Sequence, residues 1–332
     1  MSRLVRRLLL LPSFLSMDYA SAAYSSVSAA IVVNAKTGEI IYSYNSDVQT
    51  PPASLVKMMT LLLVFKTLSQ RKISPTTKVL ISPNAASQSP CTLGLKAGKT
   101  ISVRSAILAL ITKSANDVAV ALAECVGKSE NDFVAMMNRE AQRLGMGSTV
   151  FFNPSGWKNP GQLSTAADMA RLARALLQEY PNYYHLFSTR QFFFNNQRLR
   201  NHNELLGRRD GMVVDGIKTG FLNSSGFNLA ASAVNGKNRL IVVVFGGKTP
   251  RQRDAFASLL LRKGFCRLSR NGKNSSMRRL MAAGMASRRK IASTNDVHGR
   301  IHGCGIYNKI YGSVFNRGVQ IGQHKTNQHK AN

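Results

Sequence analysis

The chain has 332 residues, 44% of them hydrophobic, so it is long enough to bury a large core and is not disordered throughout. Lys and Arg number 45 against 15 Asp and Glu, which gives a formal net charge of +30. The basic residues are spread along the chain without a stacked-aromatic motif, which argues against a dedicated nucleic-acid-binding protein.

The N-terminus has the layout of a secretory signal peptide. Arg3, Arg6 and Arg7 precede an apolar run at 8–17 and a small-residue stretch at 20–22. The run is about half the length that a membrane-spanning helix needs, so we expect a cleaved signal at 1–22. The mature protein is then exported, to the periplasm or the outer face of the cytoplasmic membrane. There it meets no genome, so we expect an anionic wall polymer or membrane surface, and no nucleic acid, as the partner of the positive charge.

The predicted elements begin with a β-hairpin at 29–45, in which two apolar runs flank a turn at Lys36-Thr37-Gly38. After two prolines, residues 54–69 are rich in Leu, Met and Lys and predict a largely buried helix that starts at Ser54. Further helices are predicted at 103–111, 118–126, 132–144 and 166–178, strands at 213–217, 226–234 and 239–245, and a last helix at 250–263.

Strands at both ends of a domain commonly lie side by side, so this order predicts an α+β fold: one antiparallel sheet packed against a helical cluster. We assign this domain to residues 23–266. Residues 267–332 are basic, with Asp296 as their one acidic residue, and we expect a poorly ordered tail.

Two features of the tail allow other interpretations. Methionine and leucine at 277, 280, 281 and 285 fall at helical spacing among arginines, as in a basic amphipathic helix that lies on anionic lipid. His298, His302 and Cys304 suggest a metal site by spacing, but the partners that zinc needs are absent from the sequence nearby. We expect no metal or other cofactor. The remaining cysteines, Cys91, Cys125 and Cys266, are too scattered for a disulfide framework and are expected to be free or singly bridged.

The first motif with chemical meaning is Ser54-Leu55-Val56-Lys57. Residues three apart on a helix share a face, so the Lys57 amine can reach the Ser54 hydroxyl. A lysine removes a proton from serine only where burial or a nearby cation favours its neutral form. The pattern is common by chance and is weak alone.

Two more motifs follow in the order that the chemistry needs. Ser114-Ala115-Asn116 lies between two predicted helices, where a hydroxyl and an amide can pass a proton or hold a carbonyl, although helix capping would explain it as well. Lys218-Thr219-Gly220 ends an apolar strand, where a cation and a hydroxyl suit a carboxylate and glycine admits a close backbone approach. A second Lys-Thr-Gly at 36–38 shows that this tripeptide alone carries little information.

Together the three motifs resemble those of penicillin-binding proteins and serine β-lactamases. Stretches such as PPASLVKMMT, SANDVAVALAE and DGIKTGF are similar to the D-alanyl-D-alanine carboxypeptidases, the low-molecular-weight penicillin-binding proteins, and the likeness covers roughly residues 29–266. The resemblance implies a β-lactamase/transpeptidase-like fold. It also implies a serine-type D-Ala-D-Ala carboxypeptidase that trims peptidoglycan stem peptides through an acyl-enzyme and is inhibited by β-lactam antibiotics.

By the resemblance, Ser54 is the nucleophile, Lys57 its base, and Ser114 with Asn116 completes the proton path. A second group binds the substrate: the side chains of Lys218, Thr219 and Arg253 hold its terminal carboxylate, Gly220 admits its backbone, and the N–H groups of Ser54 and Phe221 form the oxyanion hole. His202 falls at the rim of the site.

Four other functions stay open at this point, the first a polyanion-binding protein, which the net charge of +30 alone suggests. A D,D-endopeptidase would cut cross-links with the same groups. A non-catalytic wall- or β-lactam-binding protein would not need an activated serine. A β-lactamase would need a carboxylate to direct water, and no Glu-x-x-x-Asn precedes Lys218; the segment Asn153-Pro154-Ser155-Gly156 lies there instead.

Overall fold

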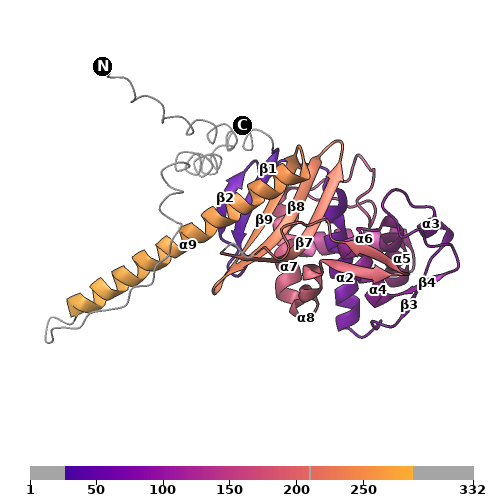
Figure 1. The fold of residues 1–332 in the computed structure, drawn as a ribbon, viewed down its shortest axis with the longest axis horizontal. Coiled ribbons are helices and arrows are strands. Elements are labelled where there is room, and N and C mark those ends of the chain that lie inside the picture. Colours follow the sequence, from indigo (N-terminus) through magenta and orange to yellow (C-terminus); the bar gives the residue numbers. More distant parts are fainter. Residues whose placement is uncertain (1–26, 209–210, 287–332) are drawn as a thin grey trace, which may run out of the picture.

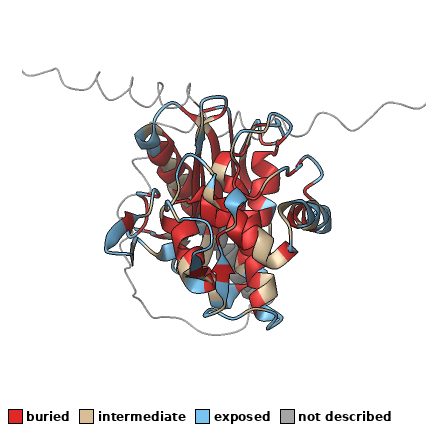
Figure 2. Ribbon diagram, turned by 90° about the vertical axis from the view of Figure 1, so that its right-hand side faces the viewer, coloured by how far each residue is buried: buried red, intermediate tan, exposed pale blue. Residues whose placement is uncertain are grey.

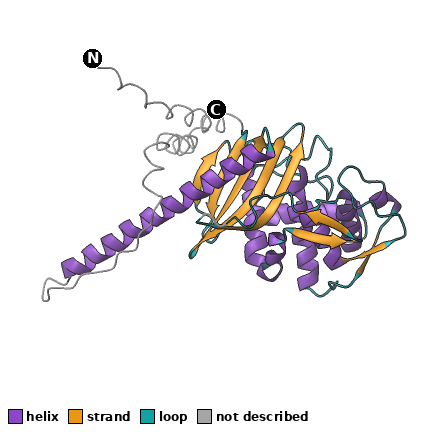
Figure 3. Ribbon diagram, viewed as in Figure 1, coloured by secondary structure: helices purple, strands orange, loops and turns teal. Residues whose placement is uncertain are grey.

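The structure, a computed structural model, describes residues 27–208 and 211–286, with residues 271–286 described as backbone only. The predicted signal peptide and the histidines of the tail lie outside these residues. Figures 1 and 3 show one sheet with a helical cluster against one face and a long helix across the other, which confirms the predicted α+β class.

The sheet has five antiparallel strands in the order β2-β1-β9-β8-β7. The strands are β1 (Ala29–Asn34), β2 (Ile40–Tyr44), β7 (Val213–Leu222), β8 (Gly226–Asn235) and β9 (Asn238–Gly247). Because β1 pairs with β9, the two ends of the domain lie side by side, as the sequence order predicts. Strand β7 is at the edge, and it is longer than the predicted 213–217, so that it includes the whole Lys-Thr-Gly motif.

The helical cluster comes from the middle of the chain. It contains η1 (Ala53–Val56), α2 (Lys57–Ser69), α3 (Pro83–Ala86), α4 (Val103–Thr112), α5 (Asn116–Gly127), α6 (Glu130–Arg143), α7 (Ala166–Glu179), α8 (Pro181–Tyr184) and η2 (His185–Ser188). Two small two-stranded sheets, β3 (Lys78–Leu80) with β4 (Thr100–Ser102) and β5 (Gln191–Phe194) with β6 (Gln197–Arg200), were not predicted. Their strands are too short to show a periodic pattern.

Alternation along the strands divides the core between the two faces of the sheet. Ile31 and Val33 of β1 pack toward the helical cluster, whereas Ala30 and Val32 pack toward α9 (Pro250–Ala286). Figure 2 shows the buried residues concentrated in the sheet and in the helices next to it. The central helix α2 is buried over most of its length, which holds the residues at its start rigidly.

The last helix is longer than predicted. We expected it to end at Lys263, before Gly264, but α9 continues to Ala286 and projects beyond the sheet (Figure 1). A Cβ on Gly264 would lie 2.7 Å from a methyl carbon of Leu240, so this glycine lets the helix pack closely on the sheet. A glycine inside a helix costs only about 1 kcal/mol, and no proline follows within the helix.

Candidate active site

The site is built around the junction of η1 and α2. Ser54 lies in η1 and Lys57 is the first residue of α2, so one turn of helix separates them. The Lys57 Nζ atom is 3.0 Å from the Ser54 Oγ atom. Ser54 is half-buried and accessible, whereas Lys57 is completely buried. The spacing predicted from the sequence therefore brings these two groups into contact.

Lys57 has two further oxygen partners. Its Nζ donates to Asn116 Oδ1 at 2.7 Å and to the backbone carbonyl of Ser155 at 2.5 Å. A neutral amine has two N–H bonds and one lone pair. When both N–H bonds point to these oxygens, the lone pair is left for the Ser54 hydroxyl to donate to. The geometry is therefore that of a base that accepts the serine proton.

The electrostatic surroundings favour the neutral form of that amine. Burial lowers the pKa of Lys57 well below its ordinary value, and the nearby positive charge of Lys218 lowers it further. The Cys91 thiol and the Asp117 carboxylate act in the opposite direction but do not outweigh these effects. The nearby Asp117 carboxylate accepts the backbone N–H groups of Leu93 and Gly94.

The second motif lies at the start of α5. Asn116 is the first residue of the helix, its side-chain amide donates to the Pro90 carbonyl at 2.7 Å, and its backbone N–H donates to the Cys91 carbonyl at 2.7 Å. These bonds fix the position of the Asn116 amide oxygen, which accepts the hydrogen bond from Lys57 Nζ. The Ser114 Oγ atom is buried and has no hydrogen-bond partner among the described residues. A buried hydroxyl without a partner is free to bind a substrate group or to pass a proton.

The third motif lies on the edge strand β7, beside Ser54. A Cβ on Gly220 would lie 3.0 Å from the Ser54 nitrogen, so glycine is needed for the strand to come this close. Lys218 is buried, and its Nζ donates to the Thr219 carbonyl at 3.0 Å. Burial lowers the pKa of Lys218 to about 7, with a further lowering by the charge of Arg253 and an opposing effect of Cys91.

Arg253 and His202 lie near Lys218. Arg253 is buried in the first turn of α9 and pairs with its neighbour Asp254, with Nε 2.9 Å from Oδ1. His202 is an exposed residue. Desolvation and the positive charges of Lys218 and Lys113 lower the pKa of its imidazole to about 4. With His202 neutral at pH 7, the positive charge that a ligand meets here comes from Arg253 and from the protonated fraction of Lys218.

Phe221 and the second Lys-Thr-Gly lie differently. The Phe221 side chain is exposed and stacks on Phe227, with ring centroids 4.3 Å apart, so only its backbone is available to the proposed oxyanion hole. Lys36 and Thr37 occupy the exposed turn between β1 and β2, away from the other motifs in the sheet.

Sequence reasoning missed the role of backbone carbonyls. The carbonyls of Ser155 and Pro90 accept hydrogen bonds from the side chains of Lys57 and Asn116, and the Cys91 carbonyl accepts the backbone N–H of Asn116. A carbonyl leaves no signature in the residue type. Three non-glycine residues of these segments, Ala53, Cys91 and Ser114, have φ values of 51°, 55° and 62°. Such strained backbone is concentrated at functional sites.

The part of the chain that the structure describes has neither a metal-binding cluster nor a membrane-spanning helix. No group of three or more His, Cys, Asp and Glu residues there could hold a metal ion. Between residues 27 and 286, leaving aside 209–210, no helix combines the length and the apolar character needed to cross a bilayer. Cys91 and Cys125 are free thiols, and Cys266 is disulfide-bonded.

Comparison with known proteins agrees with this geometry. A family model described as D-alanyl-D-alanine carboxypeptidase matches residues 17–249. The carboxypeptidase DacD of Salmonella typhimurium is 37% identical over 279 residues, which cover 79% of this chain and 71% of the relative. DacC of Escherichia coli is 38% identical over 265 residues, which cover 76% of this chain and 66% of the relative. For DacF of Bacillus subtilis the match spans 60% of the relative.

Solved structures share the fold. Penicillin-binding protein 6B from Escherichia coli superposes with a TM-score of 0.68 at 36% identity, covering 71% of this chain and 76% of that protein. Penicillin-binding protein D2 from Listeria monocytogenes, solved with ampicillin bound, gives 0.63 at 31% identity and covers 72% and 97%. Since the family match reaches residue 249 and takes in all five strands of the sheet, the chain belongs to the D-alanyl-D-alanine carboxypeptidase family.

Proposed function

We propose that this chain removes the terminal D-alanine from peptidoglycan stem peptides through an acyl-enzyme on Ser54. The observation that carries the proposal is the completely buried Lys57 amine, 3.0 Å from the Ser54 hydroxyl. Membership of the carboxypeptidase family supports it. The match spans between 60 and 71% of the Salmonella and Bacillus relatives, so the activity is proposed for the catalytic unit present in this chain.

The reaction follows from the geometry. Ser54 Oγ attacks the carbonyl of the penultimate D-alanine while its proton passes to the lone pair of Lys57. The N–H groups of Ser54 and Phe221 stabilise the oxyanion, an effect typically of about 3 kcal/mol. The Ser114 hydroxyl relays the proton from Lys57 to the leaving nitrogen, the peptide bond breaks, and free D-alanine departs. Water then attacks the Ser54 ester and releases the shortened peptide.

The substrate's terminal carboxylate is the group that selects this bond. We assign it to the Lys218 ammonium, the Thr219 hydroxyl and the Arg253 guanidinium. Lys218 and Thr219 lie on β7, and the charge of Arg253, in the first turn of α9, acts on Lys218. A carboxylate is stabilised by charge-assisted hydrogen bonds from such cations. In return, the carboxylate raises the pKa of Lys218 and keeps it protonated during the reaction.

The same groups account for inhibition by β-lactams, which acylate the same serine. The Listeria relative was solved in ampicillin-bound and cefotaxime-bound forms. In this chain the segment beside Lys57 presents the Ser155 carbonyl, and it lacks a glutamate to direct a deacylating water. A β-lactamase is therefore not the favoured function.

The signal-like N-terminus and the net charge of +30 suggest where the enzyme works. We place it outside the cytoplasmic membrane, in the periplasm or at the outer membrane face, next to its polymeric substrate. The excess of positive charge favours peripheral contact with an anionic wall polymer or anionic lipid.

The experiment that tests this function measures both products of wall cleavage. Purified wall fragments with uncut stems should release free D-alanine with the native protein and none with Ser54→Ala. Separation of cross-linked dimers without free D-alanine would identify a D,D-endopeptidase instead. Binding of the fragments with neither product would identify a non-catalytic wall-binding protein.

A further inference from the structure

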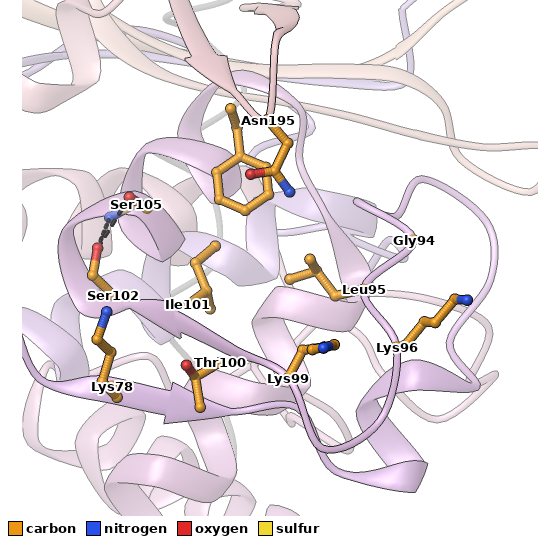
Figure 4. Close-up of a pocket in the computed structure, with 11 residues that line it drawn as sticks. Lys78, Gly94, Leu95, Lys96, Lys99, Thr100, Ile101, Ser102, Ser105 and Asn195 are labelled. Atoms are coloured by element: carbon orange, nitrogen blue, oxygen red, sulfur yellow. Dashed lines mark hydrogen bonds between the residues drawn. The ribbon is translucent and has the colours of Figure 1, made fainter.

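A second concave site lies outside the catalytic centre. It is a pocket of about 500 Å³ between the β3–β4 strand pair, the loop that precedes β4 and the tip of the β5–β6 hairpin. Figure 4 shows Leu95 and Ile101 at its centre, Asn195 on one side, and lysines on the other. The catalytic reaction described above uses none of these residues.

The pocket is positively charged. Lys78, Lys96 and Lys99 line it, all three are exposed, and none of the described residues that line it is acidic. Ser102, at the N-cap of α4, is also in its wall, so the positive end of that helix dipole lies close by. An anion is the ligand charge that complements these groups.

The floor of the pocket is apolar, which favours an anion that also has an apolar part. Leu95, Ile101 and Phe194 form it, beside the hydroxyls of Thr100 and Ser105. Inorganic ions have no apolar surface for such a floor to cover. A carboxylate on a peptide with aliphatic side chains fits both parts, since its methyl groups can cover the floor while the lysines bind the charge.

One loop joins this pocket to the catalytic centre. The Cys91 carbonyl accepts the backbone N–H of Asn116, while the N–H of Gly94, in the wall of the pocket, donates to the Asp117 carboxylate at 3.1 Å. Three residues of fully extended chain span at most about 11 Å, so the edge of the pocket lies within that distance of Cys91. The loop 91–94 therefore contacts Asn116 of the candidate site at one end and lines the pocket at the other.

We propose that the pocket binds a second stem peptide of the same wall glycan, through its carboxylate, while a neighbouring stem is cut at Ser54. The proposal rests on the function proposed above, because a substrate polymer that repeats uncut stems presents a terminal carboxylate at each of them. Binding of the second stem holds the polymer on the enzyme and raises its effective concentration at the catalytic centre.

The test is a charge-neutral triple variant, Lys78→Gln with Lys96→Gln and Lys99→Gln. Its control is Lys36→Gln with Lys128→Gln and Lys237→Gln, which removes the same charge from exposed positions outside the pocket. The quantity measured is kcat/KM for soluble glycan strands with uncut stems, divided by kcat/KM for a short peptide that ends in D-Ala-D-Ala.

We expect this ratio to fall about tenfold in the pocket variant, because three exposed charge contacts are lost and their effects on the ratio multiply. In the control variant the ratio should stay at the native value. An unchanged ratio in the pocket variant, or an equal fall in both variants, overturns the proposal.

A binding measurement separates this proposal from the catalytic one. In a Ser54→Ala background the uncut glycan strands should bind about tenfold more weakly when the three pocket lysines are replaced, whether or not the native protein releases D-alanine. A soluble glycerol-phosphate polymer is the second probe. If that polymer loses affinity in the pocket variant while the glycan strands do not, the pocket binds phosphodiesters and the proposal is wrong.

Discussion

Replacing Lys57 by methionine removes the proposed base while keeping an unbranched side chain of similar length. The Ser54 hydroxyl, the Lys218 strand edge and the oxyanion N–H groups stay in place. Without the amine, the serine proton has no acceptor within the buried contacts described here. We therefore expect the variant to fold, to bind its ligand, and to lose acylation.

The size of the loss can be estimated from the contacts. A positioned general base contributes about a hundred- to ten-thousand-fold to a rate, so acylation of Lys57→Met by a β-lactam should slow by at least that lower factor. The change leaves the acceptors of Asn116 and Ser155 without a donor, at a cost of about 1 to 3 kcal/mol each. Removal of a buried amine offsets part of this cost.

The assay is the rate of labelling by a fluorescent penicillin, followed in time and saturated in drug, next to a denaturant unfolding curve of the same protein. The account requires slow labelling in a protein that unfolds cooperatively. A folded Lys57→Met protein that is labelled within tenfold of the native rate would falsify the assignment of Lys57 as the base.

Three further changes test other parts of the site. Because the pKa of Lys218 is about 7, kcat/KM should fall above that pH, whereas kcat should persist to higher pH since a bound carboxylate raises this pKa. Lys218→Arg should abolish the fall in kcat/KM. An unaltered pH profile in that variant would refute the role of Lys218 in binding the carboxylate. Gly220→Ala should slow acylation about tenfold or more, since its Cβ would lie 3.0 Å from the Ser54 nitrogen. Gly147→Ala, with open space around it, should leave the rate unchanged. Equal acylation rates in the two variants would exclude the close approach of β7 to Ser54. The pKa of His202 is lowered from 6.5 to about 4, so the unfolded state binds more protons between these pH values and the stability of the protein falls as the pH drops through that range. In His202→Gln the urea midpoint should fall less over the same pH range. Parallel plots of urea midpoint against pH for the two proteins would argue against the lowered pKa of His202.

The sequence predicted the parts of this protein that depend on periodicity and spacing. The Ser54–Lys57 contact follows from a three-residue separation at a helix start. The pairing of β1 with β9 follows from strands at both ends of one domain. The Lys-Thr-Gly at 218–220 was distinguished from the one at 36–38 by its position after the other motifs, and the structure has the former beside Ser54.

Other features depend on tertiary contacts that no local pattern encodes. The Ser155 carbonyl reaches Lys57 across 98 positions of the chain, and the cation of Lys218 acts on Lys57 only once β7 packs beside η1. Gly264 has the residue type of a helix end, but it lies inside α9, where its lack of a side chain allows close packing against Leu240. The pocket lined by Lys78, Lys96 and Lys99 also forms only when the β3–β4 strand pair lies beside the tip of the β5–β6 hairpin.

The acyl-enzyme on Ser54 is tested by identifying the residue that carries the acyl group. The protein is incubated briefly with a labelled penicillin, denatured in acid, digested, and mapped by mass spectrometry. We expect one adduct, on Ser54, and none when Ser54 is replaced by alanine. An adduct on another residue with Ser54 unmodified would contradict this expectation.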